Sequence, residues 1–287
     1  MSFDKLHQDF LGFLRQQGRA NATVLAYGKD IEQLLEFLKE MEVDAIDTVS
    51  TEHIEKFKDS LKHLRYTPKS VSRKINSIKT FFRFLKRSNH VTQNPAEAVV
   101  HPKYDQNAPR ILTKMEYRAL RDACKHDVRV AAIVELLLQT GMRISELAGL
   151  QMPDVDLEKS HLRIREQNSQ AERNIPLNNA GKAALLNYLS IRPKTGNQET
   201  VFLTKTCRPF LVRNIRAAID RFFRIAGVAE AKVNDLRHTF IVEQLKAGTP
   251  LTYVSRLVGH KRVTTTEKYL EFVNALDNQK EHKLEEL

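Results

Sequence analysis

The chain has 287 residues, of which 41% are hydrophobic and 7% aromatic, and this composition can build the cores of about two ordinary domains. It contains no apolar run of about 18 residues, no apolar signal region at its start and only two cysteines, so the sequence predicts a cytoplasmic protein without a membrane span, a secretory signal or a disulfide framework. The formal net charge of +11 indicates a polyanionic partner, most often nucleic acid. Two other partners, a ribosome and an anionic membrane, fit the charge as well. The charge also fits a basic enzyme that has no such partner.

Residues 1–100 are predicted to form a small all-helical domain. Apolar side chains recur at helical spacing in three segments of this stretch. These segments give a first helix near residues 3–14, a second over residues 22–41 and a third over residues 50–64. Each helix would turn its apolar side toward a common core.

A fourth predicted helix carries a surplus of positive charge. It begins at Pro68, because Thr67 can cap it and proline is accommodated in the first helical turn. The surrounding segment, residues 61–96, contains no Asp or Glu, whereas solvated helices usually mix both signs. We therefore expect this helix to face DNA, with a merely solvated charged helix as the alternative. The candidate DNA-binding side chains are Lys69, Arg73, Lys74, Arg83 and Arg87.

A linker and a second domain follow. Residues 101–110 contain two prolines and no apolar periodicity, which indicates a linker, and residues 111–287 form the second domain. Thr113 and Glu116 have the spacing of a capping box before an apolar pattern. The next, long apolar helix is expected to end at Gly141, because glycine is the usual residue at a helix C-terminus.

One region of the second domain is typical of β-strands. Leu162 and Ile164 alternate with charged residues, and Asn174 to Leu177 can return as a second strand. The polar residues between them, 167–171, suit the tip of a hairpin. The predicted fold class is therefore mainly α with a small antiparallel β hairpin or sheet.

Four residues of the second domain suit chemistry at a phosphate. Arg143 and Arg237 are candidates for a phosphate clamp, because guanidinium groups match phosphate oxygens and keep their charge. Tyr269 is a candidate nucleophile that needs activation, and His260 could bind the phosphate or assist proton transfer. Taken alone, each of these residues is more often an ordinary structural one, and only their joint pattern favours chemistry. No carboxylate lies at ligand spacing from the histidines, so we expect neither a metal nor a cofactor.

The order of these residues along the chain resembles the tyrosine recombinase (phage integrase) family, and within it the Xer-like enzymes and transposon resolvases. The pattern consists of Arg143 within "TGMRISEL", then "LRHT" at residues 236–239, Gly259-His260, Thr265-Thr266 and Tyr269. The resemblance extends over nearly the whole chain. It implies a two-domain architecture, in which a helical core-binding domain clamps DNA and a mixed domain performs catalysis.

The resemblance also implies a role for each residue. Arg143 and Arg237 would bind the scissile phosphate, and His260 would hydrogen-bond it. Tyr269 would attack phosphorus and hold the DNA strand as a 3′-phosphotyrosine. The 5′-hydroxyl of another duplex would then displace the tyrosine. The bond energy stays in the protein–DNA ester, so the family needs neither ATP nor a metal ion.

Two positions depart from the family pattern. Asn234 stands where the family usually has a histidine, and the adjacent His238, or His260, could act as base instead. Asn168 stands where the hairpin normally carries the lysine that protonates the leaving 5′-oxygen. Lys205 or Lys261 could replace that lysine. General acid catalysis is worth roughly 10²–10⁴-fold, so a missing acid would slow the enzyme rather than abolish its activity.

The predicted function is that of a site-specific DNA recombinase that resolves or integrates replicons or mobile elements. The alternative is a catalytically weak or inactive accessory protein that keeps the fold and binds DNA. A third possibility, an RNA- or ribosome-associated factor, fits the charge but leaves the motif order unexplained. The expected partners are double-stranded DNA with specific paired sites and three further copies of the chain, with no membrane. The tail after Tyr269 would dock on the neighbouring subunit of that tetramer, as the family resemblance implies, with a helix packed on its own domain as the alternative.

Overall fold

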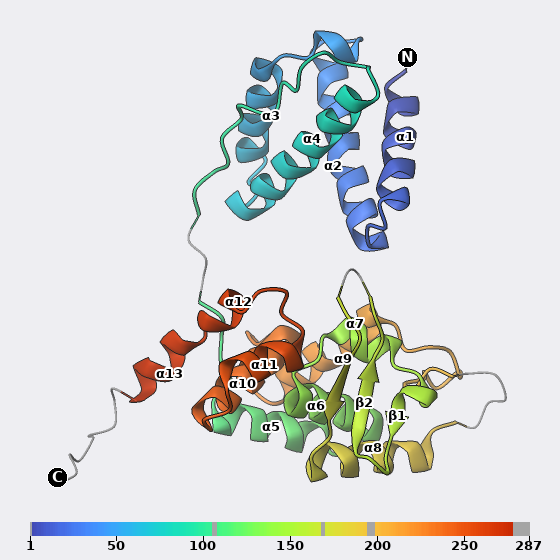
Figure 1. Ribbon diagram of the computed structural model, residues 1–287, viewed down its shortest axis with the longest axis vertical. Helices are drawn as coiled ribbons and strands as arrows, with labels where there is room; N and C mark the ends of the chain where they lie inside the picture. The colour runs from blue at the N-terminus through green and yellow to red at the C-terminus, as the bar shows by residue number, and fades with distance from the viewer. Residues whose placement is uncertain (1, 105–107, 168–169, 194–198, 278–287) are drawn as a thin grey trace. The chain divides into compact units, whose positions relative to one another are not determined.

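The fold is taken from a computed structural model, which describes residues 2–104, 108–167, 170–193 and 199–277 (Figure 1). The chain forms two compact units, Met1–Asn107 and Ala108–Leu287, and the division falls within the proline-containing segment 101–110. Each unit has its own apolar core. The predicted fold class, mainly α with a small antiparallel sheet, is confirmed.

The N-terminal unit is helical throughout its regular structure. Its elements are α1 (Phe3–Gln16), α2 (Asn21–Glu40), the short 3-10 helix η1 (Ile46–Thr48), α3 (Thr51–His63) and α4 (Pro68–Arg87). Helix α4 begins as predicted, because the Thr67 hydroxyl accepts a hydrogen bond from the backbone N–H of Ser70 and Pro68 occupies the first turn. Helix α2 packs against α1 and α4, and their apolar faces meet in one core.

The position of Lys74 corrects one expectation from the sequence. Its side chain is only 3% exposed, and its Nζ lies 2.9 Å from Oδ1 of the buried Asp30. Lys74 directly precedes the core residue Ile75 and follows Val71 by three positions, so it lies on the inward side of α4. The prediction that Lys74 binds DNA from the surface of this helix is therefore wrong.

The second unit combines helices with the sheet. Its helical elements are α5 (Lys114–Cys124), α6 (Val128–Thr140), α7 (Ile144–Gly149), η2 (Met152–Asp154), α8 (Asn179–Ile191), α9 (Val212–Ile225), α10 (Val233–Lys246), α11 (Leu251–Val258), α12 (Thr264–Glu267) and α13 (Leu270–Asp277). The apolar helix α6 packs against α5, α8, α9 and α10 and forms the centre of the core. The capping box of Thr113 and Glu116 at the start of α5 forms as predicted.

Gly141 ends α6 in the left-handed conformation, with φ of 60°. A Cβ atom at this position would lie 2.3 Å from Cδ1 of Phe240 on α10. Glycine is therefore required twice, once for the backbone angle and once for the close approach of α10. This approach brings the C-terminus of α6 next to the part of α10 that carries Arg237.

The sheet has three antiparallel strands in the order β1-β2-β3. The strands are β1 (Val155–Asp156), β2 (His161–Ile164) and β3 (Arg173–Pro176). The predicted hairpin corresponds to β2 and β3, in which Leu162 faces Ile175 and Ile164 faces Arg173. Strand β1 was not predicted, because two residues are too short to show an alternating pattern. The register places Arg173 at the hairpin end of β3, where it reaches the candidate site described next.

Candidate active site

Arg237 is held between the ends of two helices. It lies on α10 and is 8% exposed. Its Nη1 donates to the carbonyl of Gly141 at 2.5 Å, and its Nη2 donates to the carbonyl of Val258 at 2.7 Å. These carbonyls stand at the C-termini of α6 and α11, where backbone oxygens lack a helical partner and carry partial negative charge. The guanidinium group is thereby fixed by backbone rather than by mobile side chains.

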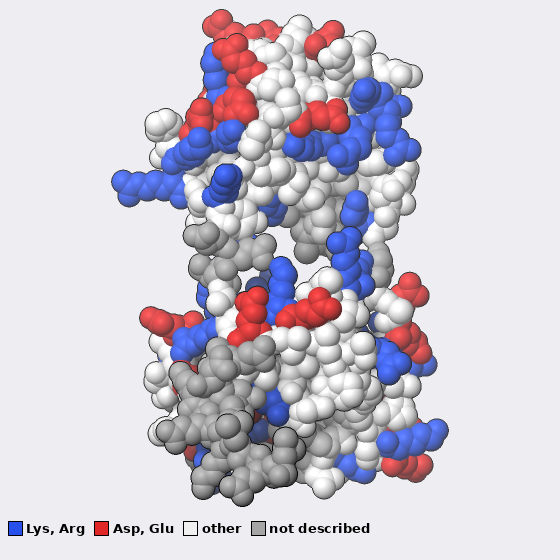
Figure 2. Space-filling model, turned by 60° about the vertical axis from the view of Figure 1, so that its left-hand side comes forward, with Lys and Arg blue, Asp and Glu red and all other residues white. Residues whose placement is uncertain are grey.

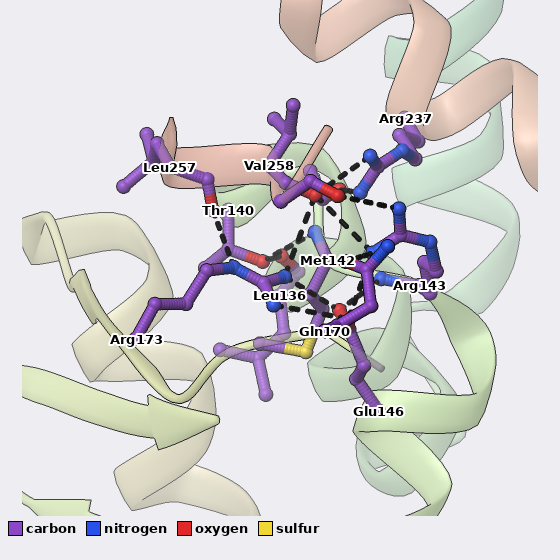
Figure 3. Close-up of polar contacts among 12 residues, drawn as sticks. Leu136, Thr140, Met142, Arg143, Glu146, Gln170, Arg173, Arg237, Leu257 and Val258 are labelled. Carbon is purple, nitrogen blue, oxygen red and sulfur yellow. Dashed lines mark hydrogen bonds and ion pairs between the residues drawn. The ribbon is translucent and has the colours of Figure 1, made fainter. Parts of the chain in front are cut away.

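Arg143 and Arg173 approach the same place from other elements, as Figure 3 shows. Arg143 caps α7, and its Nη2 donates to the carbonyl of Gly259 at 2.7 Å. Nε of Arg173 donates to the carbonyl of Leu257 at 2.8 Å. Both arginines pair with Glu146 on α7, at 2.9 Å from Arg143 and 2.8 Å from Arg173. A single buried carboxylate thus orients two guanidinium groups.

This cluster has an excess of positive charge. Arg143, Arg173 and Arg237 surround one carboxylate, that of Glu146. Burial, and then the charge of the nearby Arg143, lower the pKa of Arg237 to about 10. Burial by itself would raise the pKa of Glu146, but hydrogen bonds from Arg173 and from the Arg143 backbone outweigh it and lower the pKa. Arg237 and Glu146 therefore keep their charges at neutral pH, and the uncompensated positive charge of the cluster favours an anion.

Gly259 leaves room for these contacts. It ends α11 with φ of 69°, a left-handed conformation. A Cβ atom here would lie 2.9 Å from Cζ of Arg173 and 2.9 Å from Oε1 of Gln170, which itself accepts a hydrogen bond from Arg143. This explains why the residue before His260 is glycine: a larger residue at position 259 would displace Arg173 and Gln170.

Tyr269 points its hydroxyl at a histidine. The residue lies between α12 and α13 and is 7% exposed. Its hydroxyl lies 2.7 Å from Nδ1 of His238, which is on α10 next to Arg237. Burial lowers the pKa of His238, so the imidazole is neutral at pH 7 and can accept a proton. Burial raises the pKa of Tyr269, while Arg237 acts in the opposite direction.

His260 completes this group. Its ring stacks on that of Tyr269 with centroids 6.2 Å apart, and its Nδ1 lies 2.7 Å from Oγ1 of Thr266. Burial, and then the charge of Arg237, lower the pKa of His260 to about 4. The imidazole is therefore neutral at pH 7, and a hydrogen on its other nitrogen can be donated to an anion.

Comparison with known proteins places this geometry in a family. The model for the phage integrase family matches residues 110–274, and the model for the phage integrase N-terminal SAM-like domain matches residues 8–89. The chain belongs to the phage integrase family of tyrosine recombinases. It is a site-specific recombinase, an enzyme that cleaves and rejoins DNA strands.

Relatives of similar length support this assignment. Tyrosine recombinase XerC of Roseiflexus castenholzii is 31% identical over 272 residues, which cover 91% of this chain and 86% of that protein. Tyrosine recombinase XerC of Staphylococcus saprophyticus is 30% identical over 285 residues, which cover 94% of each chain.

Solved structures share the fold. A lambda integrase dimer bound to a COC′ core site has a TM-score of 0.75 and 17% identity over 92% of this chain and 97% of that one. The Tn1549 transposon integrase in complex with circular intermediate DNA has a TM-score of 0.75 and 19% identity over 97% of this chain and 99% of that one.

The two departures from the family pattern have different positions in this recombinase. Asn234 is exposed on α10, one turn before Arg237, and its side chain forms no hydrogen bond with the described residues. His238 follows it by four residues, so the two side chains are neighbours on one side of the helix. Asn168 lies outside the described residues.

Two residues of the cluster were not predicted from the sequence. Glu146 follows Arg143 by three positions, and this capping-box spacing could have revealed it. Arg173 offered no comparable signal, because its partners include the carbonyl of Leu257, 84 positions away along the chain. Conversely, every residue predicted to bind the phosphate in this unit, namely Arg143, Arg237 and His260, lies in the cluster.

An open hollow adjoins the cluster. Gln170, Arg173, Gly259, His260 and Lys261 are among the residues that line it. Among the described residues, no three His, Cys, Asp or Glu side chains gather closely enough to hold a metal ion. Helices long and apolar enough to cross a membrane are likewise not found in the described part of the chain.

Proposed function

We propose that Tyr269 is the nucleophile of this recombinase and that His238 is its base. The observation that carries this proposal is the distance of 2.7 Å between the tyrosine hydroxyl and His238 Nδ1. A nucleophile within hydrogen-bond reach of a neutral imidazole is the arrangement that activates a weakly acidic hydroxyl. In the tautomer that performs this step, Nδ1 is unprotonated and Nε2 carries the hydrogen.

The cleavage step follows from these positions. The Tyr269 oxygen forms a bond to phosphorus while its proton passes to His238. The bond from phosphorus to the 5′-oxygen breaks, and that oxygen takes up a proton to leave as a hydroxyl. A 3′-phosphotyrosine results. The reverse step, with the 5′-hydroxyl of another strand, rejoins the DNA without loss of the phosphoester bond energy.

The arginines and His260 would stabilise the negative charge that develops on the non-bridging oxygens of the phosphate. Arg143 and Arg237 are held by backbone carbonyls, so they are in place before the substrate arrives. Preorganised donors of this kind are worth several kcal/mol, because no reorganisation is needed when charge develops. His260 would donate to a non-bridging oxygen. A protein that only binds DNA would not need a tyrosine and an imidazole in this arrangement.

Lys261 is our candidate for the acid that protonates the leaving 5′-oxygen. It lines the hollow beside Gln170 and His260, and it forms no ion pair within the described part of the chain. Lys205, the other candidate from the sequence, lies in the turn before α9 and does not line this hollow. The ammonium group of Lys261 could therefore take the role that the family assigns to the hairpin lysine.

The DNA partner is expected to carry paired sites that four copies of this chain bring together. The lambda integrase structures include a tetramer bound to a Holliday junction, which makes a tetramer a reasonable expectation here. Deletion of residues 277–287 should reduce pairing of two sites more than binding to one. If the deletion reduced pairing and single-site binding equally, docking of the tail on the neighbouring subunit would be contradicted. Resolution of dimeric replicons, resolution of transposon cointegrates and integration all use this chemistry, and the cytoplasm is the expected location.

Covalent trapping tests the proposal. The protein is incubated with a nicked suicide duplex that carries its site, found by binding selection, and the products are separated on a denaturing gel. A protein–DNA adduct is expected for the wild type and none for Tyr269→Phe, while both bind the duplex equally. Tight, specific binding without any adduct would contradict the catalytic role and favour an accessory DNA-binding protein.

A further inference from the structure

One side of α4 presents polar and basic side chains in a continuous row. Its members follow one another at intervals of three or four residues, the spacing of one helix face. The row consists of Lys69, Arg73, Asn76, Thr80, Arg83 and Arg87. All are exposed except Thr80, which is half-buried. Figure 2 shows lysine and arginine side chains gathered across the N-terminal unit in its view.

Within this row, Arg73 differs from the other basic residues because a buried carboxylate anchors it. Its Nη1 donates to Oδ2 of Asp30 on α2, although the arginine side chain itself is 45% exposed. Asp30 is 2% exposed, and its other oxygen accepts from Nζ of Lys74 at 2.9 Å. The hydroxyl of Ser77 lies 3.0 Å from Oδ2. The carboxylate thus has partners on both oxygens.

Arg73 is not needed to neutralise Asp30. A buried carboxylate requires a compensating charge, and the equally buried Lys74 already supplies it. Lys74 is itself held from other sides, since its Nζ donates to Gln33 and lies 5.0 Å from the centre of the Tyr66 ring. The contact between Arg73 and Asp30 therefore adds little to charge balance, and its main effect is to fix the direction of an exposed guanidinium group.

The fixed group keeps one edge free for a ligand. Asp30 engages Nη1, and none of the described residues accepts a hydrogen bond from Nε or Nη2 of Arg73. Nε–H and Nη2–H are parallel donors whose spacing matches N7 and O6 of guanine in the major groove. Holding the side chain in place before binding reduces the entropy lost when the two hydrogen bonds form.

We propose that Arg73 recognises a guanine in the DNA site of this recombinase and that Asp30 is the positioning residue that orients it. The inference rests on the proposed function only in taking double-stranded DNA as the partner. Lys69, Arg83 and Arg87 form no ion pair with any described residue. Unanchored cations of this kind suit contacts to phosphates, which add affinity without sequence preference.

A binding selection separates these roles. Full-length protein with Tyr269→Phe is used, so that no cleavage occurs, and bound duplexes are enriched from a random library and sequenced. Arg73→Lys keeps the positive charge and removes the two parallel donors, Nε–H and Nη2–H. We expect it to reduce the preference for guanine at one position of each half-site by about 10-fold, while other positions keep their preference. Arg83→Lys is the matched control and should leave all base frequencies unchanged.

A second variant tests the positioning role. The double substitution Asp30→Asn with Lys74→Met removes both buried charges together, so neither is left unpaired, and Arg73 remains. In this variant the preference for guanine at the same position of the half-site should fall, while the overall affinity for random DNA should change less than twofold. Unchanged base frequencies in Arg73→Lys would overturn the inference and make Arg73 a phosphate contact. Covalent trapping through Tyr269, on a duplex that carries the selected wild-type site, would report separately on the proposed chemistry, because it detects strand cleavage and not base preference.

Discussion

Asp30 in the N-terminal unit and Glu146 in the catalytic unit are both buried carboxylates that hold two cations. At Asp30 one of these cations is a buried lysine, so only Arg73 is available to a partner. At Glu146 both cations are arginines, and each also donates to a carbonyl at the end of α11. The same device therefore produces two different sites.

The two sites differ in how their guanidinium groups can interact with a ligand. Around Glu146 the charges are fixed and in excess, because Arg237 adds a third guanidinium group that is held by carbonyls. Such a cluster attracts an anion without distinguishing one phosphate from another. Around Asp30 the excess is smaller, and a single guanidinium group, that of Arg73, stays partly exposed. Together with the inference about Arg73, the comparison assigns stabilisation of charge to the catalytic unit and recognition of a base edge to the N-terminal unit.

Glu146→Gln should have the largest effect on cleavage, because it removes the carboxylate that corresponds to Asp30 in this comparison. Without the carboxylate, Arg143 and Arg173 repel each other and lose their orientation. We expect single-turnover cleavage to fall on the order of 10²–10³-fold, as for loss of a preorganised donor. The free energy of unfolding should fall by about 3 kcal/mol, because Arg143 and Arg173 lose the carboxylate that compensates their charge. Measurement combines covalent trapping with urea unfolding.

Glu135→Gln is the matched control for that substitution. Glu135 on α6 is 14% exposed and accepts two hydrogen bonds of 2.8 Å from Arg121, but neither residue lies in the arginine cluster. It should lower stability and leave the cleavage rate within about threefold. If both variants lost cleavage to the same degree, the loss would reflect stability, and the special role of Glu146 would be contradicted.

His238→Gln should have the next largest effect. Glutamine can accept a hydrogen bond from Tyr269 but cannot take its proton, so cleavage should slow by about 10²-fold. The pH profile gives an independent readout. Because the folded-state pKa of His238 lies below 6.5, the wild-type rate should rise with pH below that value and be level near pH 7. The variant should lose this dependence.

The exposed His126, in the loop before α6, offers the same substitution away from the site. His126→Gln should match the wild type in rate and in pH profile. A His238→Gln enzyme that keeps both the rate and the wild-type pH dependence would remove His238 as base. His260, with its pKa near 4, would then be the remaining imidazole beside Tyr269.

The sequence predicted the elements of both units better than it predicted their charged contacts. Helix α4 and the hairpin could be found because capping, periodicity and alternation are local properties. The assignment of Lys74 failed because a run of like charges does not show which of its members lies inside, although Val71 and Ile75 mark an inward side next to it. Its partner, Asp30, lies 44 residues earlier, where no local pattern connects them.

The same reasoning explains what could be predicted of the active site. Arg143, Arg237, His260 and Tyr269 stood in a recognisable order, and the structure gathers them. The contact between His238 and Tyr269 depends on how α10 faces the segment between α12 and α13, which is a tertiary property. The arginines are held mainly by backbone carbonyls, and a carbonyl has no signature in a sequence.

Lys261→Ala should give the smallest and most specific effect. An exposed lysine is a less well placed acid than a buried one, so we expect cleavage of an ordinary phosphodiester to slow by only about 10-fold. A substrate whose bridging 5′-oxygen is replaced by sulfur needs no acid, since a thiol has a far lower pKa than an alcohol. The variant should cleave that substrate at the wild-type rate.

Lys205→Ala serves as the control for this prediction, because Lys205 is the other candidate acid. It should slow neither substrate. If sulfur restored Lys205→Ala instead, the acid would be Lys205, and the hollow beside His260 would only hold DNA. Equal slowing of both substrates by Lys261→Ala would make Lys261 a phosphate contact. The arginine cluster would then stabilise the transition state while the leaving oxygen takes its proton from water. Cleavage by this recombinase would then be slow because Asn168 replaces the usual lysine.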